Sequence, residues 1–174
     1  VLLVSPSIAA PPSVADYWSI QEAINANPGA MIFVPGGDYE LAEPIRIATD
    51  RTGLYGDGRL IQTKAAAPIV QIEKATHVSL RGLRMSRPEE ATETSSEAVL
   101  AIDCEAISVV GLEVEDNRTD AAVISLRNCT NVRVESCEIR DYMRISVDDR
   151  TGSDDWGYAF NCINGSGIRI SDCR

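Results

Sequence analysis

Four segments in the second half of the chain share one alternation of apolar and polar residues. In each segment apolar residues occupy the first and third positions and return from the sixth. The pattern predicts two short strands separated by a bend, with a single apolar face turned to the core. The segments begin at Val78, Ile107, Val132 and Ile168.

A further strand-like run precedes each segment, so each repeat contains three predicted strands. Asp103, Asn128 and Asn164 each stand four residues before a segment. The first segment is the exception, because Lys74 occupies the same position there. Asn and Asp tolerate the left-handed backbone of a tight corner, and stacked copies can hydrogen-bond along a ladder. Three strands per repeat, a polar corner in register and connections of variable length predict an all-β fold, a right-handed parallel β-helix. Its core should contain Val78, Leu80, Ile107, Val109, Val132, Val134, Ile168 and Ile170.

The N-terminal third predicts a cap for this β-helix. Ser19 and Glu22 form a capping-box pattern, which predicts a short capping helix over residues 20–26. Strand-like runs follow at 31–34, 39–41 and 45–47. We therefore expect a cap and the first coils over 13–67 and regular coils over 68–174.

The two ends of the chain need separate interpretation. Residues 1–12 are apolar and close on small residues and prolines, which fits either a signal-peptide remnant or a leading strand. The repeated pattern is interrupted at Arg174. A β-helix left open there would expose unpaired backbone groups, so we expect further coils or a cap in a longer parent chain.

Composition restricts the partners. The chain has 174 residues, a net charge of −10 and a pI near 4.5, which disfavours nucleic acid and anionic membrane surfaces. No apolar run approaches the roughly 20 residues of a membrane span. The five cysteines show no close pairs, but Cys104 should stack on Cys129, and Cys137 on Cys173. Buried thiols are the favoured interpretation, and disulfides the alternative.

Two stretches resemble a known family. The sequence of 19–25 leading to 32–39 looks like the N-terminal cap of pectin-lyase-like β-helix proteins, and 128–134 resembles their common coil. The resemblance implies a scaffold that serves lyases, hydrolases, epimerases and phage tailspikes. It therefore implies a polysaccharide or oligosaccharide as partner.

Two rows of outward residues follow from the register. Arg84, Glu113 and Glu138 form one row, and Ser86, Glu115 and Arg140 the other. Because coils stack about 4.8 Å apart, carboxylates and guanidiniums come within pairing distance. The rows fit a solvated, salt-bridged face, and Glu113, Glu115 and Glu138 are also candidates for substrate binding.

The loop over 141–158 is the longest and carries most of the candidate chemistry. Tyr142, Trp156 and Tyr158 can stack on sugar rings. The carboxylates can act as acid, base or calcium ligands, and a merely acidic surface loop is the alternative. The candidate calcium ligands are Asp148, Asp149, Asp154 and Asp155.

Two reaction types are compatible with these residues. Asp120, with Asp154 or Asp155, stands where polygalacturonase-like hydrolases place catalytic aspartates, although the Asn-Thr-Asp, Gly-His-Gly and Arg-Ile-Lys patterns are incomplete or absent. Arg144 or Arg150 beside the aspartates resembles the arginine base of calcium-dependent pectate lyases. We predict a secreted or periplasmic carbohydrate-active protein in which glycoside hydrolysis by paired carboxylates is favoured. A calcium-dependent lyase and a non-catalytic glycan-binding adhesin or tailspike-like module are the alternatives.

Overall fold

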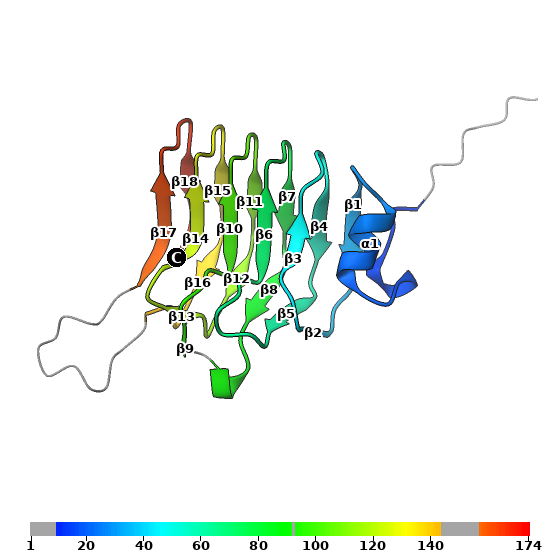
Figure 1. Ribbon diagram of the computed structural model, residues 1–174, viewed down its shortest axis with the longest axis horizontal. Helices are drawn as coiled ribbons and strands as arrows, with labels where there is room; N and C mark the ends of the chain where they lie inside the picture. The colour runs from blue at the N-terminus through cyan, green and yellow to red at the C-terminus, as the bar shows by residue number, and fades with distance from the viewer. Residues whose placement is uncertain (1–9, 92, 144–156) are drawn as a thin grey trace, which may run out of the picture.

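The computed structural model describes residues 10–91, 93–143 and 157–174. The chain winds into a parallel β-helix in which three parallel sheets surround one core, as predicted (Figure 1). In Figure 1 the chain rises along the near sheet, crosses the top and descends the far side while it advances from right to left, which makes the coil right-handed.

Each coil contributes one strand to each sheet. Sheet A consists of β1 (Met31–Val34), β4 (Gly53–Gly56), β7 (Ser79–Arg81), β11 (Ser108–Val110), β15 (Arg133–Glu135) and β18 (Arg169–Ser171). Sheet B consists of β2 (Asp38–Leu41), β5 (Arg59–Gln62), β8 (Arg84–Ser86), β12 (Glu113–Val114) and β16 (Glu138–Ile139). Sheet C consists of β3 (Ile45–Ile47), β6 (Val70–Glu73), β10 (Val99–Ile102), β14 (Ala122–Arg127) and β17 (Tyr158–Ile163).

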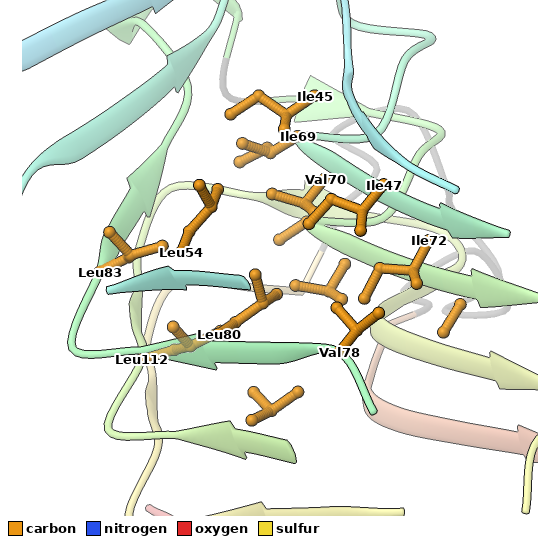
Figure 2. Close-up of a cluster of buried hydrophobic side chains, with 14 of the residues drawn as sticks. Ile45, Ile47, Leu54, Ile69, Val70, Ile72, Val78, Leu80, Leu83 and Leu112 are labelled. Carbon is orange, nitrogen blue, oxygen red and sulfur yellow. The ribbon is translucent and has the colours of Figure 1, made fainter. Parts of the chain in front are cut away.

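The core is a stack of mainly aliphatic side chains from all three sheets. Figure 2 shows the part of it that comes from sheets A and C and from the turns leading into sheet B. In sheet A, Val109 pairs with Leu80 on one side and Val134 on the other, and all three side chains are fully buried. The predicted burial fails in the last segment, where Ile170 is 40% exposed and Ile168 is only half-buried. Ile170 lies on β18, the outermost strand of sheet A, so no neighbouring strand covers its far side within the described residues.

The polar corner joins sheet C to sheet A and has the predicted conformation. Lys74, Asp103, Asn128 and Asn164 all have a positive φ between 51° and 55°. The Asn128 side-chain amide donates to the Asp103 carboxylate at 2.8 Å, and the Asn164 side-chain amide donates to Oδ1 of Asn128 at 3.3 Å. The ladder therefore fixes the register of three successive coils.

A cap covers the first coil. It contains a 3₁₀ turn, η1 (Val14–Asp16), and the predicted helix α1 (Ile20–Ala26). The Ser19 hydroxyl accepts from the Glu22 N–H at 3.1 Å, and the Glu22 carboxylate accepts from the Trp18 N–H at 2.8 Å. Ile20, together with Ala23 and Ile24, buries the apolar face of α1.

All five cysteines are free thiols, but the interpretation as buried thiols holds for only three of them, because Cys173 is half-buried and Cys162 is exposed. Cys104, Cys129 and Cys137 are buried, and burial raises the pKa of the Cys137 thiol to about 11. Such thiols act as small apolar side chains. Within the described residues, no helix has the length and apolar character required to cross a membrane.

Candidate functional site

The outer face of sheet B carries the charged row expected from the sequence. Arg84 pairs with Glu113 in the strand register, and Glu113 pairs with Glu138. The same row continues toward the N-terminus through Arg59 and Asp38. Acidic and basic side chains are thus stacked along the axis of the β-helix.

Ion pairs hold both ends of this row. Arg59 makes two hydrogen bonds to the Asp38 carboxylate, at 3.0 and 2.6 Å, and they hold the pKa of Asp38 below its usual range. Arg174 bonds to Glu138 at 2.7 Å and, with a smaller contribution from Arg140, lowers the pKa of that carboxyl. These two carboxylates are therefore charged at neutral pH.

A polar groove of about 760 Å³ crosses this face and the loops that follow its strands. Its lining contains both acidic and basic side chains from several coils. The lining residues are Glu40, Arg59, Ile61, Ser86, Arg87, Pro88, Glu89, Glu115, Asp116 and Arg118.

Stacked loops form one wall of the groove. The short strands β9 (Glu93–Thr94) and β13 (Arg118–Thr119) pair in parallel, and η2 (Glu89–Ala91) precedes β9. Thr119 continues the stack, because its N–H donates to the Tyr142 carbonyl at 3.0 Å. Loops of three successive coils are therefore tied together beside sheet B.

Arg87 anchors this wall from inside. Its side chain is only 3% exposed although it also contributes to the groove lining. The guanidinium donates to the Asn117 side chain at 2.7 Å and to the carbonyl oxygens of Lys64 and Ala67 at 2.7 and 2.9 Å. Burial lowers the pKa of Arg87 to about 10, and the nearby Glu97 opposes that shift, so the group stays charged at neutral pH.

A second hollow of about 380 Å³ adjoins the groove. It is lined by Arg118, Asp141, Tyr142 and Met143, and Arg118 lines both cavities. Tyr142 is half-buried and Met143 is 43% exposed. The two cavities lie next to each other and share Arg118, and together they are called the depression below.

Two aspartates occupy equivalent places on successive coils at this junction. Asp116 and Asp141 each come directly after the outward residues Glu115 and Arg140, which form a 3.3 Å ion pair. Both aspartates have a left-handed backbone, with φ of 55° and 49°. Since their coils stack, their backbones lie about 4.8 Å apart. Within the part of the chain that the structure describes, neither carboxylate has an ion pair.

This arrangement can support acid–base chemistry on a sugar chain. Glycoside hydrolysis requires two carboxyl groups, one to protonate the leaving oxygen and one to activate water or attack the sugar. The depression offers stacked carboxylates, arginines that can bind hydroxyl or acidic groups, and Tyr142 at its edge. Among the described residues, no group of three or more His, Cys, Asp or Glu side chains could hold a metal ion.

The structure places part of the predicted site at this depression. Glu115 and Tyr142 line it, Glu113 and Glu138 lie on the same sheet face, and the exposed Asp120 follows β13. Tyr158 is 52% exposed at the start of β17. The other predicted catalytic, aromatic and calcium-binding residues lie outside the described residues: Arg144, Asp148, Asp149, Arg150, Asp154, Asp155 and Trp156.

The sequence analysis missed Asp116, Asp141 and the buried Arg87. A signal for the two aspartates was present, because both follow the eighth position of the repeated segment by two residues. Nothing in the pattern marked Arg87, whose partners Asn117, Lys64 and Ala67 come from two separate loops.

Comparison with known proteins supports the fold. No protein-family model matches the chain, and a search of curated proteins gives no significant match. Among solved structures, the chain is similar to the crystal structure of a candidate glycosyl hydrolase from Parabacteroides merdae. The TM-score is 0.65 at 12% sequence identity, over 87% of this chain and 75% of the other. At this identity the likeness establishes a shared fold.

Proposed function

We propose that this protein is a carbohydrate-active β-helix of the pectin-lyase-like type that hydrolyses glycosidic bonds in a polysaccharide. The observation that carries the proposal is the pair Asp116 and Asp141, stacked on successive coils at the junction of the two cavities. The structural neighbour from Parabacteroides merdae, a candidate glycosyl hydrolase, supports the same class of reaction. The proposal includes a secreted or periplasmic location, where the protein would meet extracellular polysaccharides.

In this proposal the sugar chain follows the axis of the β-helix along sheet B. Arg59 and Arg118 bind its polar groups from the groove lining, and Tyr142 supports a ring at the end of the depression. One aspartate protonates the glycosidic oxygen, and the other activates water or attacks the anomeric carbon. Glu115, ion-paired with Arg140, positions the chain.

The test is a screen of the purified protein against neutral and acidic polysaccharides. New reducing ends without ultraviolet absorbance from unsaturated ends indicate hydrolysis, whereas absorbance that rises in step with them indicates a lyase. On the active substrate, Asp116→Asn and Asp141→Asn should each lower kcat by at least about a hundredfold. Asn tolerates a left-handed backbone, so both variants should keep the fold.

Asp172→Asn is the matched control, because Asp172 is an exposed aspartate with a φ of 56° at another corner. Its activity should equal that of the unchanged protein. Asp120→Asn tests the aspartate predicted from the sequence in the same assay. Full activity of both the Asp116 and Asp141 variants would contradict the assigned pair, and binding without any product would favour a glycan-binding module.

A further inference from the structure

A separate apolar hollow lies on a different sheet and shares no lining residue with the groove or with the hollow beside Arg118. It has a volume of about 490 Å³ and lies on the outer face of sheet A near the cap. Its lining residues are Pro11, Met31, Tyr55, Gly56, Arg81 and Gly82. Since the outer faces of this β-helix are otherwise rich in charged residues, an apolar hollow here requires an explanation.

Aromatic and thioether side chains form its floor. Tyr55 lies opposite Phe33 in the strand register, and their rings are 5.3 Å apart at an angle of 41°. Two residues before this pair, Met31 lies opposite Gly53 in the same strand register. A Cβ atom placed on Gly53 would lie only 2.4 Å from the Met31 sulfur. Met31 therefore lies over Gly53 and extends the apolar surface beside Tyr55.

One cation borders this floor. Arg81 pairs with Tyr55 in the strand register and with Val110 on its other side, so both neighbours in its row are apolar or aromatic. Its Nε–H donates to the Ser79 hydroxyl at 2.9 Å, and its side chain is exposed. Within the described ranges, no carboxylate forms an ion pair with Arg81.

The far end of the same sheet shows a different arrangement. There Arg133 forms an ion pair with Glu135, although both residues are on the surface. Arg81 thus combines an exposed guanidinium that has no ion pair among the described residues with an adjacent aromatic floor. The combination suits a ligand that has an apolar face and a negative group.

We propose that this hollow is a second, non-catalytic binding site for a sugar unit that carries a carboxylate. The C–H face of the sugar ring packs on Tyr55 and Met31, and the terminal N–H groups of Arg81 bind the carboxylate. The site adds an anchoring point for an acidic glycan on a face away from sheet B. It goes beyond the proposed hydrolysis and requires no reaction at Asp116 or Asp141.

The test is a titration followed by ¹H–¹⁵N NMR with two probes, trigalacturonate and the neutral maltotriose. We expect trigalacturonate to shift the amides of Tyr55, Arg81 and Gly82, and maltotriose to bind there more weakly. Arg81→Gln should weaken trigalacturonate binding at these amides about tenfold, because a charge-assisted hydrogen bond is lost. Tyr55→Leu, which keeps apolar contact with Phe33, should weaken binding of both sugars.

Arg133→Gln is the control on the same sheet and should leave the titration unchanged. Asp116→Asn separates the two sites, because it affects hydrolysis and leaves the amides of this hollow responsive. Absence of shifts at these three amides at millimolar trigalacturonate would overturn the inference. An Arg81→Gln titration identical to that of the unchanged protein would also overturn it, and neither result would bear on hydrolysis in the groove.

Discussion

Arg87 shows how a single residue can set the shape of a surface groove. Its guanidinium crosses from the groove lining into the interior and bonds to side-chain and carbonyl oxygens of separate loops. Carbonyl oxygens in such loops lack strand partners, so a buried donor replaces the water they would otherwise bind. The loops beside sheet B therefore depend on one arginine for their relative placement.

Replacing Arg87 should cost more stability than replacing an exposed arginine. Arg87→Met keeps the apolar stem but leaves the acceptors buried without partners, and we expect a loss of about 2–4 kcal/mol. Arg87→Lys should lose less stability than Arg87→Met but still be less stable than the unchanged protein, since one ammonium cannot reach all the loops. Urea unfolding followed by circular dichroism measures the change. Arg46→Gln, at an exposed site, is the control, and an equal effect of both changes would contradict the role of Arg87.

At the scale of elements, the corner between sheets C and A holds the coils in register. Asn128 combines a positive φ of 54° with hydrogen bonds toward both neighbouring coils. Two variants separate these contributions. Asn128→Gly keeps the backbone and loses the ladder, so we expect a loss of about 1 kcal/mol. Asn128→Ala also strains the left-handed backbone and should lose about 1–2 kcal/mol more.

Thermal and urea unfolding of the two variants check this prediction. A lower stability of Asn128→Gly than of Asn128→Ala would contradict the assigned role of the backbone. Equal stability of both variants and the unchanged protein would show that the ladder contributes nothing.

The elements were largely predictable because their signals are local. Alternation at Val78 and Leu80 marks one strand, and Asp103 and Asn128 mark a corner within the same repeat. Ile170 follows the same pattern and is nevertheless 40% exposed, because burial depends on the neighbouring coil and not on the strand itself. Arg87 was not predictable, since arginine is usually exposed and its partners are distant in sequence.

The candidate site was predictable only in part for the same reason. The outward row of Glu113 and Glu138 follows from the strand period, and the structure has it in the expected register. The importance of Asp116 and Asp141 depends on the stacking of the loops after sheet B, which the alternation of residues does not encode. Their common place in the repeat becomes meaningful once the groove is known.

For the whole molecule, surface ion pairs predict how stability depends on pH. Neighbouring arginines lower the pKa values of Asp38, Glu135 and Glu138. A carboxyl with a lowered pKa in the folded state adds stability above its unfolded pKa and loses it as the pH falls through the folded pKa. The urea midpoint should therefore be nearly constant from neutral to mildly acidic pH and fall at lower pH.

A variant and a salt control test this acid dependence. Glu138→Gln removes one titrating group, so its midpoint should fall less steeply with acid than that of the unchanged protein. High salt should reduce the difference, because these pairs are at the surface. A midpoint that rises as the pH falls in the acidic range would contradict the assignment of these ion pairs.

The central claim is that a sugar chain binds along sheet B and its loops. Hydrogen–deuterium exchange of the Asp116→Asn variant, with and without the oligosaccharide product identified in the screen, tests it directly. We predict slower exchange at β8, β12 and residues 115–119, with sheet C unchanged. Protection confined to sheet C, or no protection near Asp116 and Asp141 at saturating sugar, would contradict the account.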